Sequence, residues 1–223
     1  VETYVFDKNV EITRDEVAAR ADSATYDKRK GIMRLFKSPV VWYDSTQLFA
    51  ESTVVYIKDN KLNRIHAKGK AFSGSRDTLN ARRIDQLSGA EIIMDFAADT
   101  VSGIVSSGNA KSLYFLESEE TADGAARNGA DTILIEFSGG EPEKIRWLGA
   151  IEGEYYPEKF VAGTEKNLYL PDFKWEESKP VKILIENRKN SKPVKSGEKE
   201  KSPNETGNSE GKKEKIKLND KEE

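Results

Sequence analysis

The chain has 223 residues, of which 36% are hydrophobic and 34% are charged, and its formal net charge is −3. This apolar share lies well below that of an average globular domain, which argues against one thick core that uses the whole chain. The absence of cysteine excludes disulfides and thiolate metal sites, and a single histidine excludes a two-histidine site. The mildly acidic balance argues against a nucleic-acid partner. We expect no metal and no other cofactor.

The first 185 residues show the pattern of an all-β protein. In chain order, β-branched and aromatic runs predict strands over residues 39–43, 53–57, 92–96 and 133–137. Turn residues such as Asp59-Asn60 and Ser138-Gly139-Gly140 bound these runs. The polar, alanine-rich stretch 118–128 is predicted to be a loop. No apolar run approaches the ~18 residues of a membrane-spanning helix, so we expect a chain that does not span a membrane.

The composition changes near the C-terminus. The last 37 residues, from Asn187 onward, contain no aromatic residue and are rich in Lys, Glu, Ser, Gly and Asn. Such a segment cannot bury enough apolar surface to offset its ordering entropy. We therefore expect a β-domain over residues 1–185, the C-terminal part of a longer array, and a disordered Lys/Glu-rich tail over 186–223.

An internal repeat organises the β-domain. Each unit opens with alanine and an acid, continues through two strands, and then reaches a step of small residues. The opening pairs are Ala21-Asp22, Ala50-Glu51, Ala90-Glu91 and Ala130-Asp131. One unit cannot cover its own apolar face, but stacked units form a continuous interior. The repeat predicts an elongated, folded stack of short antiparallel strands.

Several phrases resemble the LptA/OstA-like family of lipopolysaccharide-transport proteins. They are Asn9-Val10-Glu11-Ile12, Ala21-Asp22-Ser23-Ala24-Thr25-Tyr26-Asp27, Gly69-Lys70-Ala71-Phe72 and Gly108-Asn109-Ala110-Lys111-Ser112-Leu113-Tyr114-Phe115. The resemblance covers residues 1 to about 160, although Lys70 stands where the family pattern has asparagine. It implies an elongated β-jellyroll that holds lipopolysaccharide acyl chains in an apolar groove without catalysis. It also implies a location in the Gram-negative periplasm, in possible association with the outer membrane.

Alternate residues on the predicted strands would form the apolar wall of such a groove, because successive side chains of a strand point to opposite faces. The candidate lipid-binding residues are Val54, Tyr56, Ile65, Ile92, Met94, Phe96, Ile104, Ile133, Ile135, Phe137, Ile145 and Trp147. If these rows pack against one another, they form a dry core, and the protein is a structural scaffold with no lipid ligand. If the two halves separate, they line a channel.

The sequence offers weak candidates for catalysis. His66 alternates with Arg64 and Lys68, which is typical of a solvent-facing strand position. A glycosidase needs only two suitably spaced carboxylates, but the repeat already explains the acids that follow alanine. The basic clusters Lys28-Arg29-Lys30 and Arg82-Arg83 are compatible with lipid phosphates or with solvated positions.

The expected partners follow from the resemblance and from the open sheet. The resemblance implies lipopolysaccharide and other Lpt-type transport components. A stack of strands also leaves open edges, which invite pairing with a second copy end to end. We expect association that depends on concentration and weakens when proline enters a terminal strand.

Overall fold

The structure, a computed structural model, describes residues 2–14, 17–77, 80–118 and 121–181. The tail predicted over 186–223 lies outside these residues. The described chain is almost entirely β-structure, which confirms the predicted all-β class. Its strands are β1 (Thr3–Arg14), β2 (Val17–Asp27), β3 (Ile32–Phe36), β4 (Val40–Tyr43), β5 (Thr46–Phe49), β6 (Ser52–Lys58), β7 (Lys61–Arg76), β8 (Ile84–Ala97), β9 (Thr100–Ser118), β10 (Thr121–Ser138), β11 (Glu141–Leu148) and β12 (Glu152–Pro157).

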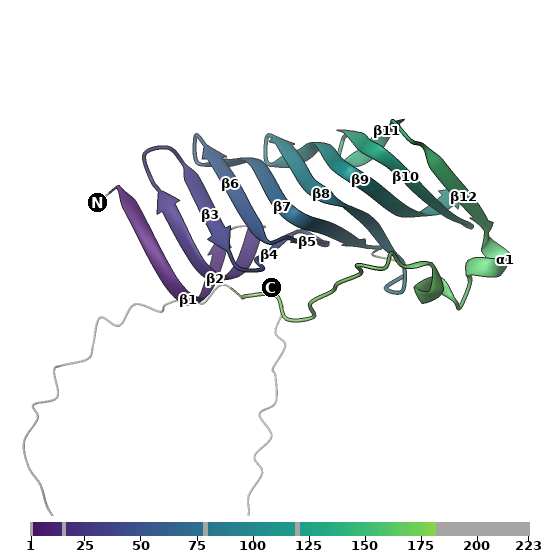
Figure 1. Cartoon of the computed structure of the whole chain (residues 1–223), viewed down its shortest axis with the longest axis horizontal. Helices are drawn as coiled ribbons and strands as arrows, with labels where there is room; N and C mark the ends of the chain where they lie inside the picture. Colours follow the sequence, from purple (N-terminus) through teal and green to yellow (C-terminus); the bar gives the residue numbers. More distant parts are fainter. Residues whose placement is uncertain (1, 15–16, 78–79, 119–120, 182–223) are drawn as a thin grey trace, which may run out of the picture. The chain divides into compact units, whose positions relative to one another are not determined.

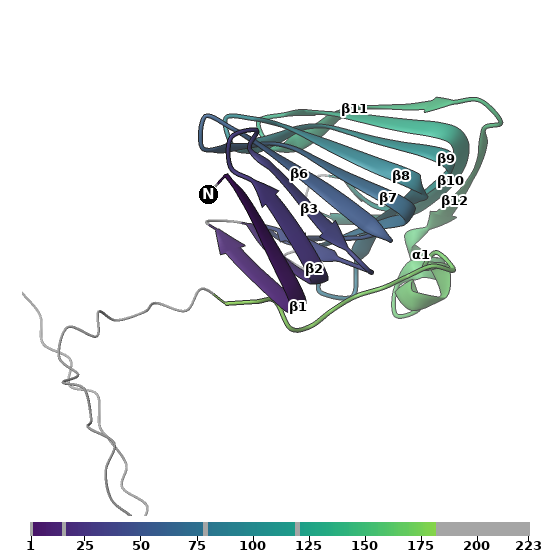
Figure 2. The same cartoon turned by 60° about the vertical axis from the view of Figure 1, so that its left-hand side comes forward.

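All of these strands belong to one antiparallel sheet that folds over into two layers (Figures 1 and 2). The strands β3, β6 and β11 lie in one layer, here layer A, whereas β4, β5 and β12 lie in the other, layer B. Long strands cross between the layers: β7 pairs with β6 in layer A and with β5 in layer B. Similarly, β10 pairs with β11 over one part and β12 over another. The strands β1, β2, β7, β8, β9 and β10 therefore run through both layers and are longer than expected, whereas the other strands are short, as predicted.

At five places where the chain changes layer, it passes through a pair of residues with positive φ, and we call the line of these places the corner line. The pairs are Lys8-Asn9, Lys37-Ser38, Gly69-Lys70, Gly108-Asn109 and Gly149-Ala150. The strands β2, β8 and β10 cross this line without such a pair. The register shifts at the same places, for example between Lys68 and Ala71 and between Ala130 and Thr132. Extra residues of this kind bend a strand and increase its twist, and Figure 2 shows the long strands turning there.

The corner line explains the small-residue step of the repeat. At Gly69, φ is +81°, and an added Cβ would lie 2.4 Å from a carboxylate oxygen of Glu51. At Gly149, φ is +69°, and an added Cβ would lie 2.0 Å from the carboxylate of Asp131. Glycine adopts a positive φ without a steric penalty, and its lack of a Cβ leaves room for the neighbouring carboxylate. Two acids of the repeat, Glu51 and Asp131, therefore lie against the corners, which gives them a structural role.

The unequal repeat lengths also have a structural reason. In each unit, the chain forms two antiparallel segments in layer A, turns at the corner line, and then forms two antiparallel segments in layer B. Between Ala21 and Ala50, the layer-B part consists of β4 and β5, which have four residues each. In the next unit, the chain in layer B runs along the second part of β7, a connecting loop and the first part of β8. The longer excursion in layer B therefore lengthens the later units.

Two apolar clusters pack on opposite faces of layer B. The inner cluster fills the space between the layers and includes Leu35, Leu48, Ile65, Ile92 and Ile133, all almost fully buried. The outer cluster includes Trp42, Phe49, Phe72, Leu113 and Phe115. Burying each such side chain contributes roughly 1.5–3 kcal/mol, so both clusters stabilise the same layer.

A C-terminal segment, residues 158–181, covers the outer cluster. It begins with the short helix α1 (Glu158–Val161), continues through the 3-10 turn η1 (Glu165–Leu168), and then crosses layer B back toward β4 (Figure 1). Val161 and Leu170 are buried in the outer cluster. The Leu170 N–H donates to Gln86 at 2.8 Å, and Gln47 bonds both the N–H and the C=O of Glu176. Side chains of the sheet thus bind the backbone of this segment.

The loop predicted over residues 118–128 is wrong, because residues 121–128 form the first part of β10. This stretch lies between β9 and β12 and pairs with both. Its small residues are required there: Ala125 is fully buried, and a Cβ on Gly124 would lie 2.2 Å from the carbonyl oxygen of Tyr156. Tertiary packing overrides the weak strand propensity of the sequence.

Candidate binding site between the two layers

The inner cluster is the strongest candidate for an apolar binding site. Nine of the twelve candidate lipid-binding residues belong to it or pack against it. They are Ile65, Ile92, Met94, Phe96, Ile104, Ile133, Ile135, Ile145 and Trp147. These residues come from five neighbouring strands, β7 to β11, and form one continuous apolar wall on the inner face of layer A.

The other three candidates, Val54, Tyr56 and Phe137, are not part of the inner cluster. On β6, the residues that join the inner cluster are Val55 and Ile57, so Val54 and Tyr56 point to the outer face. Four consecutive residues of β6 are apolar or aromatic, and alternation alone cannot tell which pair faces inward. Phe137 lies two residues after Ile135 on β10 and is partly buried, but it is not among the residues that pack against the inner cluster.

The wall is less tightly covered at the β11 end of the sheet. Ile104, Ile135, Ile145 and Trp147 are only partly buried, whereas Ile65, Ile92 and Ile133 are almost fully buried. The opposing stretch of β10, 124–130, consists of glycine, alanine, arginine and asparagine. Small side chains in layer B therefore leave the bulky side chains of layer A incompletely covered at this end.

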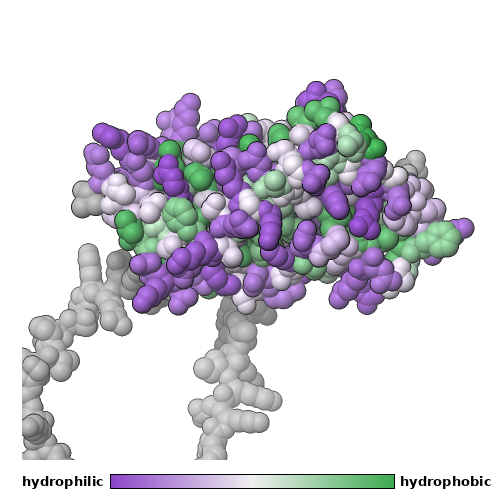
Figure 3. Space-filling model, viewed as in Figure 1, coloured by the Kyte–Doolittle hydropathy of each residue, from purple (hydrophilic) through white to green (hydrophobic). Residues whose placement is uncertain are grey.

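The opposite end of the sheet also presents aromatic side chains. Tyr4 and Phe6 of β1 are 39% and 41% exposed. Phe6 pairs with Ala24, which belongs to the inner cluster, so both aromatic residues continue the inner face. The interior therefore carries partly exposed apolar residues at both ends. Figure 3 shows apolar side chains at the β11 end, where Leu148, Ile151, Tyr155 and Phe160 are exposed.

Two contacts connect the layers on the side opposite the corner line, which we call the mouth. The Tyr43 hydroxyl of layer B donates to the Asp99 carbonyl of layer A at 2.7 Å, and the Tyr43 ring packs edge-on against Phe96. Arg14 donates a hydrogen bond to the carbonyl of Asn60 in the turn between β6 and β7. In this structure the layers are therefore bridged across the mouth.

Two groups near the interior, Asp85 and Tyr114, have raised pKa values. Desolvation raises the pKa of Asp85 to about 7, and the nearby carboxylates of Asp77 and Glu117 add to the effect. The Phe115 N–H, which donates to Asp85 at 2.8 Å, acts in the opposite direction. Desolvation also raises the pKa of Tyr114, with contributions from Asp85 and from Glu141 of β11. The β8–β9 part of the interior therefore favours neutral groups.

The remaining polar candidates have structural roles. His66 is not simply solvent-facing: its side chain is 16% exposed, and Nε2 lies 2.8 Å from a Glu91 carboxylate oxygen. This contact lowers the pKa of Glu91. Arg83 is buried and bonds Glu158 of α1 at 2.6 Å, so it anchors the C-terminal segment. Lys28, Arg29 and Lys30 are exposed in the turn after β2.

Within the described part of the chain, no group of three or more His, Asp or Glu side chains is arranged to hold a metal ion. A helix with the length and apolarity needed to cross a membrane is likewise not found among these residues.

No family model matches the sequence, and no curated protein matches it. Among solved structures, the chain is similar to LptH, described as the LptA-homologous periplasmic component of the lipopolysaccharide transport device of Pseudomonas aeruginosa. The TM-score is 0.47 with 17% identity, over 63% of this chain and 95% of that chain.

Proposed function

We propose that this chain is a non-catalytic periplasmic carrier that shields the acyl chains of lipopolysaccharide between its two layers during transfer to the outer membrane. Its partners would be lipopolysaccharide, other Lpt-type components and further copies of itself. The observation that carries the proposal is the continuous apolar inner wall from β7 to β11, which becomes only partly buried at the β11 end.

The physical chemistry of acyl chains supports this reading. Removing one methylene from water yields about 0.8 kcal/mol, and the wall presents isoleucine, methionine, phenylalanine and tryptophan side chains along successive strands. The partly buried residues at both ends of the sheet would let an apolar chain pass from one molecule to the next without crossing water. The sequence phrases shared with the LptA/OstA-like family support lipopolysaccharide as the ligand.

A structural scaffold with a dry core is the second candidate, and a specific observation favours it. Leu35, Leu48, Ile65, Ile92 and Ile133 fill the middle of the interior with almost no exposure, and two hydrogen bonds bridge the mouth. A carrier must therefore move its layers apart to accept acyl chains along the whole wall. A scaffold would keep them together.

Native mass spectrometry of the full chain with lipopolysaccharide, and with a phospholipid as a control, separates the two candidates. The informative substitution is Ile145→Glu, which places a charge on the partly buried part of the wall. The matched control is Leu148→Glu, because Leu148 lies on the same strand and is 50% exposed.

For a carrier, we expect stoichiometric lipopolysaccharide binding that Ile145→Glu abolishes and Leu148→Glu leaves unchanged, with circular dichroism showing that both variants fold. If the folded protein binds neither lipopolysaccharide nor the phospholipid, the result favours the scaffold. Equal loss in both variants would place the lipid outside the interior.

A further inference from the structure

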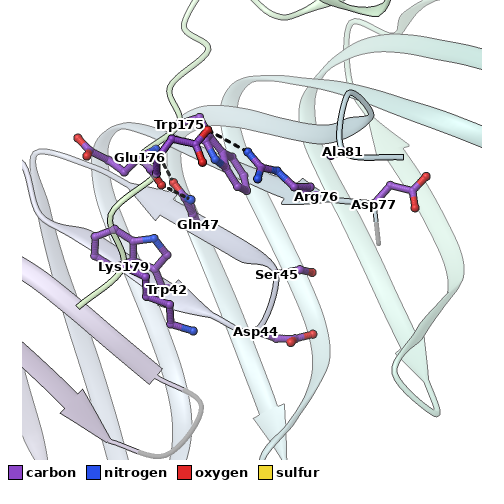
Figure 4. Close-up of a pocket in the computed structure, with 11 residues that line it drawn as sticks. Trp42, Asp44, Ser45, Gln47, Arg76, Asp77, Ala81, Trp175, Glu176 and Lys179 are labelled. Carbon is purple, nitrogen blue, oxygen red and sulfur yellow. Dashed lines mark hydrogen bonds and ion pairs between the residues drawn. The ribbon is translucent and has the colours of Figure 1, made fainter. Parts of the chain in front are cut away.

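The two faces of layer B carry different side chains between β7 and β10. On the outer face, Phe72 and Phe115 belong to the outer cluster. Figure 4 shows Gln47 and Arg76 turned toward the C-terminal segment, where the Gln47 amide bonds the backbone of Glu176. Because successive side chains of a strand point to opposite faces, the residues that alternate with these positions face the interior.

Six of the residues that face the interior here are polar, and we call them the polar inner face. They are Ser73, Ser75, Asp85, Ser112, Tyr114 and Asn128. Each lies two or four positions along its strand from a member of the inner cluster, namely Ala71, Leu87, Ala110 or Ala130. They are also neighbours across the strands; for example, Asp85 pairs with Ser75. The interior therefore has an apolar side in layer A and a hydrogen-bonding side in this part of layer B.

Groups of the polar inner face are available to a ligand. Within the described residues, the Tyr114 hydroxyl makes no hydrogen bond, and it is not one of the polar atoms that the fold encloses completely. Asp85 accepts the Phe115 N–H with one carboxylate oxygen, at 2.8 Å, which leaves its second oxygen for a ligand. Desolvation raises the pKa of Asp85 to about 7, and a neutral carboxyl donates as well as accepts. This face therefore offers both donors and acceptors.

The charges around the polar inner face restrict the ligand further. Asp77 and Glu117 lie close enough to Asp85 to contribute to its raised pKa. Arg83, the basic residue that acts on Asp85 in the opposite direction, pairs with Glu158 at 2.6 Å. Like charges brought together at close range oppose binding, so a phosphate or carboxylate is disfavoured here. A neutral group that hydrogen-bonds, such as a hydroxyl or an amide, meets no such repulsion.

We propose that the polar inner face makes the interior selective for acyl chains that carry a neutral hydrogen-bonding group, a hydroxyl or an amide, over plain hydrocarbon chains. The hydrocarbon packs on the apolar wall of layer A, and its polar group bonds Tyr114 and its neighbours in layer B. A plain chain would take water from these groups and return no hydrogen bond, which costs free energy. The inference rests on the proposed carrier function and adds the chemical class of chain that the carrier prefers.

Three neutral probes that differ by one hydroxyl test the selectivity. They are glucosamines N-acylated with a plain myristoyl chain or with a myristoyl chain hydroxylated at C3 or at C12. Native mass spectrometry of the full chain measures their binding below the concentration at which they aggregate. We expect at least one hydroxylated probe to bind about three- to tenfold more tightly than the plain one, as one additional hydrogen bond implies.

The outcomes separate this inference from the carrier function. Equal affinity for all three probes, or a preference for the plain chain, would overturn the selectivity and leave the carrier function standing. If the folded protein binds none of the probes and no lipopolysaccharide, both the carrier function and the selectivity are wrong.

Matched variants locate the selectivity. Tyr114→Phe removes one hydroxyl from the polar inner face and keeps the ring, and Tyr156→Phe is its control. Tyr156 packs against the outer cluster, and its hydroxyl bonds Glu154. We expect Tyr114→Phe to reduce the preference for the hydroxylated probe to about twofold or less without weakening the binding of the plain probe, whereas Tyr156→Phe leaves the preference unchanged.

A double variant addresses the neighbouring hydroxyls. Ser112→Ala with Tyr114→Phe removes two groups of the polar inner face and adds no volume, and circular dichroism shows whether it folds. A preference for the hydroxylated probe that persists in the folded double variant would overturn the assignment to this face. An equal loss of preference in Tyr156→Phe would overturn it as well, because that hydroxyl lies on the outer face.

Discussion

At the scale of single residues, the fold depends on backbone positions that turn a strand from one layer into the other. Five pairs of residues with positive φ perform this role. Where glycine occupies the first position of a pair, an acid or an alanine of the repeat lies directly against it, as at Gly149 and Asp131. At these positions of the corner line, both the positive φ and the lack of room for a Cβ therefore favour glycine.

The substitution Gly149→Ala tests both the positive φ and the lack of space for a Cβ, and Gly139→Ala is its control. Both glycines have positive φ, but a Cβ on Gly139 would meet nothing within 4 Å. The control variant should lose about 1 kcal/mol of unfolding free energy from backbone strain alone. We expect a loss at least 1 kcal/mol larger, as an order-of-magnitude figure, for Gly149→Ala, because Asp131 must move. Urea unfolding measures both; equal losses would show that the contact with Asp131 costs nothing.

The raised pKa of Asp85 predicts that the unfolding free energy of the protein depends on pH. Its pKa is raised from 3.8 to about 7 in the folded state, so the folded protein keeps a proton that the unfolded chain has released. This group therefore destabilises the fold progressively as pH rises from about 4 to about 7.

Between about pH 5 and pH 8, the unfolding free energy of the native chain should fall by about 2–3 kcal/mol relative to that of Asp85→Asn. Asparagine keeps an acceptor for the Phe115 N–H but does not titrate. Urea unfolding of both proteins at the two pH values measures the difference. Parallel pH profiles would show that Asp85 ionises normally.

At the scale of elements, the C-terminal segment is joined to layer B by a buried ion pair. The Arg83 side chain is 4% exposed and bonds Glu158 at 2.6 Å. Removing only the carboxylate with Glu158→Ala leaves a buried charge without its partner. We expect this to cost about 3 kcal/mol of unfolding free energy.

The double variant Arg83→Met with Glu158→Ala should recover most of that loss, because it removes the unpaired charge and keeps apolar contact with Phe115, over which Arg83 lies. Urea unfolding measures both variants. A double variant as unstable as Glu158→Ala would assign the loss to packing of α1 instead of charge.

The strands that the sequence predicts over 39–43, 53–57, 92–96 and 133–137 are present, except that β4 begins at Val40 and not at Pro39, because local β-propensity and burial agree there. The inward face of 92–96 could also be predicted, since Asp95 identifies the other face as the more polar one even though Ile93 lies on it. The face of 53–57 could not, because both sets of alternate residues contain apolar side chains.

Other features depend on residues far apart in the sequence. The first part of β10 is a strand because β9 and β12 both pair with it, which no local pattern signals. The C-terminal segment is bound through contacts of Gln47 with Glu176 and of Arg76 with Trp175. The repeat does not continue after residue 155, and the aromatic residues that follow give no indication in the sequence of where they pack.

At the scale of the whole folded unit, the sheet ends in strands with unpaired edges. Among the residues that the structure describes, β1 pairs only with β2, and β11 and β12 pair only with β10. Such edges are templates for another strand, and exposed Tyr4 and Phe6 lie beside one of them.

We therefore predict self-association through β1. Replacing Tyr4 and Phe6 by lysine, a residue that protects natural edge strands, should shift the apparent mass from oligomer to monomer in light scattering over a concentration series. Asn60→Lys, in the turn between β6 and β7, serves as a charge control. A native chain that stays monomeric at all concentrations would contradict the prediction.

The corner line also determines how the layers would move apart. Because the six strands β1, β2, β7, β8, β9 and β10 belong to both layers, any separation of the layers would have to bend all six at the corner line. The left-handed residues there lie in β1, β7 and β9, whereas β2, β8 and β10 cross the line without them. Separation would also break the bonds from Tyr43 to Asp99 and from Arg14 to Asn60, which join the layers across the mouth.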